Sequence, residues 1–84
     1  MKLQEFLNVH RASSKLRVEL LCTPTSWEQD NIFDGYERDY DDFLTEEFKT
    51  LCEEWGDCDI VNVGAGTDIN DIAYTSVIIQ GWED

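Results

Sequence analysis

The segment that decides the fold lies at residues 15–22, which read Lys-Leu-Arg-Val-Glu-Leu-Leu-Cys. Apolar side chains alternate with polar ones here, so that Leu16, Val18, Leu20 and Cys22 share one face. Because successive side chains of a strand point to opposite faces, this pattern predicts a strand with one buried face. Pro24 follows shortly after, and a proline cannot donate to a sheet ladder, so we expect the strand to end there.

Residues 42–55 carry the strongest helical pattern of the chain. Apolar side chains recur there at the spacing of one helix face: Leu44, Phe48, Leu51, Cys52 and Trp55. Asp42 or Thr45 can cap the start, and Gly56 is expected just beyond the end. The outer face carries four glutamates, Glu46, Glu47, Glu53 and Glu54, which only Lys49 offsets.

The remaining elements are shorter. The spacing of Leu3, Phe6, Leu7 and His10 predicts a helix over residues 2–10. A weaker strand is expected over residues 31–34, running toward residue 36, with Gly35 marking a bulge or turn. Strands over residues 59–63 and 72–80, the second ending near residue 82, form a predicted hairpin around a turn at residues 64–68.

The order of elements is therefore helix, strand, strand, helix, strand, strand. This order predicts an α+β fold in which a small antiparallel sheet of about four strands has two helices packed on one face. A chain of 84 residues corresponds to a single domain, residues 1–84.

Composition excludes several classes of protein. Ten aromatic residues are too many for a disordered acidic tail. No stretch approaches the roughly 18 apolar residues of a membrane span, and no signal-peptide pattern opens the chain. Three cysteines without a CxxC motif disfavour both a disulfide framework and a zinc site. These features predict a folded protein of the cytoplasm of a host cell, with apolar thiols and no contact with membranes.

Catalytic and metal sites receive little support. The carboxylates of residues 39–42 form a surface run rather than a pocket that would shift their pKa values. A calcium loop would use Asp30, Asp34 and Asp41, but Ile32 and Arg38 occupy two of its ligand positions. His10, the single histidine, lies on the apolar face of its helix. We therefore expect a protein that is not an enzyme, with no catalytic residues, no cofactor and no metal. A protein that binds divalent cations is kept as a third hypothesis, after the two given below.

The distribution of charge is the most informative functional feature. The chain has a net charge of −13, and residues 28–59 hold thirteen of its nineteen acids against two basic residues, a net charge of −11. The plainer interpretation is a solvated face that improves solubility. The segregation of charge favours a second interpretation, a surface that attracts cationic partners and repels nucleic acid, so that direct nucleic-acid binding is not expected.

A carboxylate row can imitate a row of phosphates. Carboxylates three or four residues apart on a helix lie about 5–6 Å from each other. Aromatic side chains are interspersed with the acids and can anchor an interface: Trp27, Phe33, Tyr36 and Tyr40. For Phe33 we favour core packing.

In size, charge and scarcity of chemistry, the whole chain resembles small acidic proteins of phages and mobile elements that mimic nucleic acids. These include many anti-CRISPR inhibitors of Cas nucleases and some anti-restriction proteins. The run at residues 32–39, Ile-Phe-Asp-Gly-Tyr-Glu-Arg-Asp, after an opening helix with Leu3 and Leu7, is also similar to short Firmicutes phage proteins.

The resemblance implies a non-enzymatic inhibitor that binds the basic nucleic-acid groove of a nuclease such as a Cas effector. The candidate partner-binding residues are Asp34, Tyr36, Glu37, Asp39, Tyr40, Asp41, Asp42, Glu46, Glu47, Glu53 and Glu54. The alternative is a small structural or regulatory adaptor that binds a protein partner, or forms a homodimer, through apolar surface.

Overall fold

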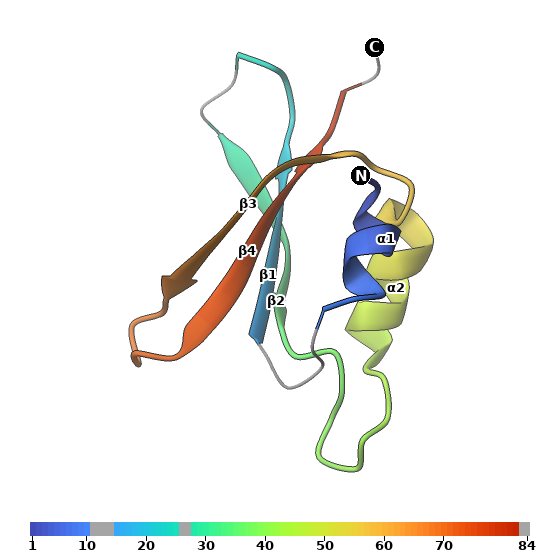
Figure 1. Cartoon of the computed structure of the whole chain (residues 1–84), viewed down its shortest axis with the longest axis vertical. Helices are drawn as coiled ribbons and strands as arrows, with labels where there is room; N and C mark the ends of the chain where they lie inside the picture. Colours follow the sequence, from blue (N-terminus) through green and yellow to red (C-terminus); the bar gives the residue numbers. More distant parts are fainter. Residues whose placement is uncertain (11–14, 26–27, 83–84) are drawn as a thin grey trace.

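The computed structural model describes residues 1–10, 15–25 and 28–82 (Figure 1). It contains two helices and four strands in the predicted order: α1 (Leu3–Leu7), β1 (Lys15–Leu21), β2 (Gln29–Gly35), α2 (Glu46–Trp55), β3 (Ile60–Thr67) and β4 (Ala73–Gln80). The predicted α+β fold is confirmed.

The four strands form one mixed sheet in the order β2-β1-β4-β3. The two hairpins, β1–β2 and β3–β4, are antiparallel, whereas the central strands β1 and β4 run parallel, with Val18 beside Val77. We expected an antiparallel sheet, and this part of the prediction is wrong, because the central pair of strands is parallel. The reason is that α2 returns the chain to the end where β2 began, so the second hairpin repeats the orientation of the first, as crossover helices do.

The core lies between one face of the sheet and the two helices, which lie on the same side in Figure 1. Its apolar members are buried: Leu3, Leu7, Leu16, Val18, Phe33, Phe48, Leu51, Val77 and Ile79. Leu16 and Val18 are fully buried, which confirms the alternation predicted for β1. Cys22 falls just beyond the strand and is exposed, so the predicted buried face ends before it.

The second helix begins at Glu46, which confirms Thr45 rather than Asp42 of the two predicted caps. Thr45 is its N-cap, and its hydroxyl accepts a hydrogen bond from the backbone N–H of Phe48 at 3.2 Å. Asp42 has a φ of 67°, which is incompatible with a helix. Gly56 caps the far end in a right-handed conformation, and its Cβ would lie 2.5 Å from the carbonyl oxygen of Cys52, so close approach explains the glycine.

The second hairpin turns later than predicted. β3 runs through Gly64 and Gly66 to Thr67, and the turn follows at residues 68–72. Asp68 builds this turn, because its carboxylate accepts hydrogen bonds from the backbone N–H groups of Asn70 and Ile72. Gly66 lets Tyr74 lie across the strand, since a Cβ there would be 2.7 Å from the tyrosine hydroxyl. In β2 the bulge is at Ile32, and Gly35 ends the strand.

Candidate partner-binding surface

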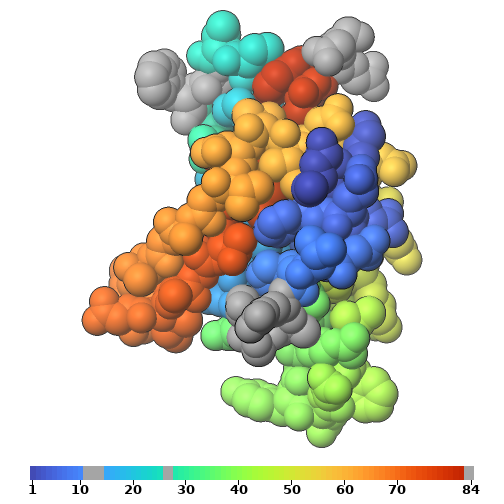
Figure 2. Space-filling view, in the orientation of Figure 1, coloured from blue at the N-terminus to red at the C-terminus, as the bar shows by residue number. Residues whose placement is uncertain are grey.

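The eleven predicted site residues do not form one surface. They fall on the face of the sheet opposite the helices, in a buried contact, in the loop at residues 36–45, and on α2. In Figure 2 the loop projects from the body at the lower end, while the β3–β4 hairpin projects in another direction. Trp27, also named as a candidate anchor, lies outside the described residues.

Asp34 lies on the open face of the sheet, where it pairs with cations of β1. Its carboxylate is 3.5 Å from the Lys15 ammonium and 3.3 Å from the Arg17 guanidinium. Arg17 also donates to the Tyr74 hydroxyl and stacks over that ring, 4.4 Å from its centroid. The charge of Asp34 is thus largely balanced within the chain, on the face away from α2.

Glu37 is buried rather than presented to a partner. Its carboxylate lies 3.0 Å from Nδ1 of His10, and the side chains of Glu37 and His10 are 8% and 6% exposed. The backbone carbonyl of Glu37 accepts from the N–H of Thr45. These contacts fasten the end of α1 to the loop that precedes α2.

In the loop at residues 36–45, some side chains hold the backbone in place through hydrogen bonds and others are exposed to solvent. Asp39 accepts hydrogen bonds from the backbone N–H groups of Asp41 and Phe43 at 2.9 and 3.1 Å. Arg38 donates to the backbone carbonyl of Asp42 at 2.8 Å. Tyr36 is half-exposed, whereas Tyr40 is fully exposed and Phe43, which sequence reasoning missed, is 70% exposed. The loop therefore offers two aromatic rings among carboxylates.

The glutamates of α2 are all exposed to solvent, where a partner could reach them. Glu46 lies 3.4 Å from Lys49, a weak exposed pair. Glu47, Glu53 and Glu54 are exposed and have no ion-pair partner among the described residues. We call the loop at residues 38–45 together with α2 the acidic flank.

A groove of about 340 Å³ runs between α2 and β2 on this flank. Ile32, Leu51 and Trp55 supply its apolar lining. Glu46, Glu47 and Glu54 surround it with carboxylates, and Thr50 completes the wall. Such a site suits the side chain of lysine or arginine, whose aliphatic stem packs on apolar surface while its charged end remains near acids. The acidic side chains of this groove could be recognised in the sequence. The approach of Ile32 in β2 to α2 could not, because the two elements are separate in the chain.

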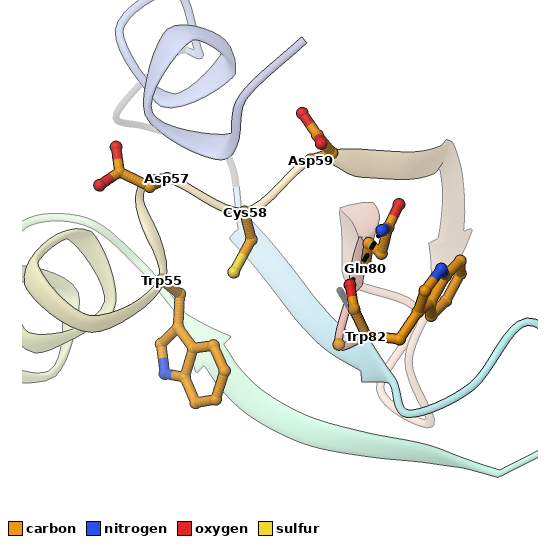
Figure 3. Close-up of a pocket in the computed structure, with 7 residues that line it drawn as sticks. Trp55, Asp57, Cys58, Asp59, Gln80 and Trp82 are labelled. Atoms are coloured by element: carbon orange, nitrogen blue, oxygen red, sulfur yellow. Dashed lines mark hydrogen bonds between the residues drawn. The ribbon is translucent and has the colours of Figure 1, made fainter. Parts of the chain in front are cut away.

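A second hollow, of about 400 Å³, lies at the other end of α2 and was missed from the sequence. Trp55, Cys58 and Trp82 contribute to its lining, and Asp57 and Asp59 stand beside them. Figure 3 shows the two indole rings on either side of the Cys58 side chain, with both carboxylates turned away from the rings. Asp59 pairs with Lys2 at 3.1 Å. The run Asp57-Cys58-Asp59 after the helix was the available signal.

The cysteine environments disfavour thiolate chemistry. A hydrogen bond to Asp30 raises the pKa of the Cys22 thiol, and burial raises the pKa values of Cys52 and Cys58. A reactive thiol needs the opposite shift. Within the described residues, no group of three or more histidine, cysteine or carboxylate side chains is arranged to hold a metal ion.

Comparison with protein-family models, with curated proteins and with solved structures found no match for this chain. Of the helices in the described part of the chain, none has the length and apolar character required to cross a membrane.

Proposed function

We propose that this protein is a non-enzymatic inhibitor that occupies the basic nucleic-acid-binding groove of a nuclease, such as a Cas effector, by imitating nucleic acid. The observation that carries the proposal is the acidic flank itself. Glu47, Glu53 and Glu54 have no cationic partner among the described residues, and Glu47 and Glu54 border an apolar groove. This combination of unpaired charge and apolar anchor sites is how interfaces gain both steering and affinity.

The spacing of the carboxylates supports electrostatic mimicry. Glu47 and Glu54 are seven residues apart on α2, about 10 Å along the axis at about 1.5 Å per residue. One strand of duplex DNA carries about three phosphates over this length, at about 3.4 Å per charge. The helix alone is less densely charged than DNA, so the acids of the loop, Asp39, Asp41 and Asp42, are needed to extend the row.

The acids are not equally suited to mutational tests. Reversing the charges of Asp39, Asp41 and Asp42 would disturb the loop, because Asp39 accepts two backbone hydrogen bonds and Asp42 has a positive φ. Replacing Glu47, Glu53 and Glu54 with glutamine changes charge alone. The matched control is Thr23→Lys, Thr25→Lys and Asn70→Lys, at three exposed positions outside the acidic flank. Both triple variants change the net charge from −13 by +3, to −10.

The experiment measures cleavage of target DNA by a panel of guide-loaded Cas nucleases and restriction nucleases, with increasing amounts of each variant. We expect the wild-type chain to inhibit at least one nuclease and excess DNA to relieve that inhibition. The glutamine variant should bind at least about tenfold more weakly, whereas the lysine control should stay within about threefold of wild type. Equal loss in both variants would reduce the effect to net charge. A wild-type chain that inhibits no nuclease of the panel, or a glutamine variant that inhibits as well as wild type, would reject the proposal.

The second candidate function is an adaptor that binds through apolar surface. It is favoured by the exposure of Tyr40 and Phe43 at the tip of the loop. An interface of this kind predicts an affinity that barely changes between low and high salt, whereas electrostatic mimicry predicts strong weakening by salt. Replacing Tyr40 and Phe43 with serine should remove most of the affinity of an adaptor, whereas an inhibitor should keep its strong dependence on salt whether or not Tyr40 helps to anchor it.

A further inference from the structure

β3 forms one edge of the sheet and carries less protection than edge strands usually have. Its eight residues, Ile60–Thr67, include no charged side chain and no proline. The opposite edge, β2, contains Asp30 and Asp34 and is bent by the bulge at Ile32. Charges and bulges of this kind prevent edge-to-edge pairing between sheets. β3 has a bulge of its own, at Val61 near its start, but it has no charge. Beyond this bulge β3 is therefore the edge of the two that can accept another strand.

The outer side of β3 is paired only at its start. The N–H of Ile60 donates to the carbonyl of Met1 at 2.9 Å. The N–H of Leu3 donates to the carbonyl of Cys58, also at 2.9 Å. Lys2 and Asp59 form an antiparallel bridge between these bonds. From Val61 to Thr67, no described residue pairs with the outer side. This stretch, which we call the open edge, ends at the turn that Asp68 builds.

Charge restricts which molecule can approach the open edge. The strand order places β3 farthest from β2, against which α2 packs, so the acidic flank lies on the other side of the molecule (Figure 1). The two acids next to β3 are paired with lysines: Asp59 with Lys2 at 3.1 Å and Asp68 with Lys15 at 2.8 Å. A second copy, which also carries −13, meets least repulsion on this side.

The surface beside the open edge is apolar. Val61 and Val63 of β3 are each 46% exposed, and Ile69 and Ile72 of the turn are also exposed. Burial of these side chains would add to the hydrogen bonds of a new strand pairing. A strongly cationic partner, by contrast, would be attracted to the acidic flank rather than to this uncharged strand.

We propose that two copies of the chain pair through their open edges, antiparallel, about a two-fold axis at Gly64. Gly64 lies in the regular part of β3 beyond the bulge at Val61, and a two-fold axis makes the same surface of each copy contact the other. In this register Val63 faces Ala65 of the partner subunit, while Val61 lies at the bulge, outside the regular pairing. Two four-stranded sheets become one eight-stranded sheet, with the acidic flanks at its two ends.

Gly64→Asp is the variant that tests this register. A Cβ at Gly64 would meet no atom within 4 Å, so the single chain can accommodate the aspartate. In the dimer it would place two carboxylates face to face at the axis. Val9→Asp is the matched control, because it makes the same change in charge at an exposed position beyond α1. Gly64→Thr adds a residue that favours strands without adding charge.

The experiment is sedimentation equilibrium of each purified chain from micromolar to millimolar concentration, at low and high salt. We expect the wild-type chain to dimerise, and more tightly at high salt, because salt screens the repulsion between the copies. Val9→Asp and Gly64→Thr should dimerise within about threefold of wild type, whereas Gly64→Asp should dimerise at least about tenfold more weakly. A monomeric wild type, or a Gly64→Asp chain that dimerises as tightly as wild type, would overturn the proposal.

Amide hydrogen exchange provides a measurement that does not depend on the folding of a variant. In the wild-type chain, protection of amides within residues 61–67 should rise with protein concentration, while protection within β2 should not. Unchanged protection across that range would also overturn the proposal. The variant with Glu47, Glu53 and Glu54 replaced by glutamine should dimerise at least as well as wild type, so failure of nuclease inhibition and failure of dimerisation are separate results.

Discussion

Residues 34–42 and helix α2 are similarly acidic in sequence, but they use their carboxylates in different ways. In the first region Asp34 pairs with cations of β1, Glu37 with His10, and Asp39 with backbone amides. In α2, Glu47 and Glu54 project from the helix without a cationic partner among the described residues. The density of acids in a sequence therefore does not identify which of them a partner can reach. The groups that surround each acid in the folded structure do.

The largest expected effect is a loss of stability in Glu37→Ala, in which a buried acid is removed. The comparison is Glu47→Ala, in which an exposed acid is removed. Without Glu37, Nδ1 of His10 loses its partner, and Nε2 is already buried with none among the described residues. We expect a loss of about 1–3 kcal/mol in the free energy of unfolding. Glu47→Ala should change it by no more than about 0.5 kcal/mol. Urea denaturation monitored by circular dichroism measures both.

The control for this prediction is Glu37→Gln, whose amide oxygen can still accept a hydrogen bond from His10. Its free energy of unfolding should lie between those of wild type and Glu37→Ala. If Glu37→Ala were as stable as wild type, the buried contact would have no role in joining α1 to the loop.

A smaller effect is expected from Asp39→Ala, compared with Asp41→Ala. The Asp39 carboxylate accepts two backbone hydrogen bonds, each of which contributes about 0.5–1.5 kcal/mol, partly replaced by water at this exposed site. We expect a loss near 1 kcal/mol for Asp39→Ala and almost none for Asp41→Ala. Faster amide exchange at Phe43 in the first variant alone would show that the loop has loosened. Equal rates in both variants would contradict the ordering role of Asp39.

Asp68, in the turn of the second hairpin, should make the stability of the protein depend on pH. A hydrogen bond from Lys15, with two from the backbone, lowers the pKa of Asp68 from 3.8 to about 2. Because the folded pKa is depressed, this contribution is present above about pH 4 and is lost as pH falls toward 2. Urea midpoints should therefore fall between pH 4 and 2, and less steeply in Asp68→Asn.

The matched control here is Asp71→Asn, in the same turn. Asp71 has a φ of 61°, a conformation that asparagine tolerates. Its urea midpoints should follow those of wild type over the whole pH range. A wild-type slope in Asp68→Asn would show that other carboxylates are responsible for the acid sensitivity.

Much of the fold was predictable because the local patterns agree with the tertiary structure. The alternation at Leu16 and Val18 and the spacing of Phe48 and Leu51 both reflect the buried face of their element. The ends of elements were less predictable. Gly64 and Gly66 resemble a turn in sequence, but the turn is set by the side chain of Asp68. The glycine at 66 is explained by Tyr74, which lies opposite it on β4.

The candidate site was predictable in part, for a related reason. The outward position of Glu47 and Glu54 follows from helical periodicity alone. The burial of Glu37 depends on His10, 27 residues away, and the groove depends on Ile32 approaching α2. The parallel pairing of β1 with β4 likewise depends on where α2 returns the chain. Contacts between distant segments leave no local pattern that the sequence could show.

The smallest expected effect compares the two ends of α2. Glu47 is in the first turn, where the helix dipole favours a carboxylate, whereas Glu53 and Glu54 are in the last turn, where it does not and where no basic residue balances them. At low salt, Glu54→Gln should therefore stabilise the protein by about 0.3–0.5 kcal/mol, and Glu47→Gln should destabilise it by a similar amount. Both changes should shrink in high salt.

The sign of this difference bears on function. A glutamate at the unfavourable end of a helix does not help the fold, so binding is the reason we infer for its presence. Glu54→Gln should then weaken nuclease inhibition while it raises the urea midpoint. If instead this variant gains stability and inhibits as well as the wild-type chain, Glu54 is not part of the binding surface, and the acidic flank is confined to the loop and the first turn of α2.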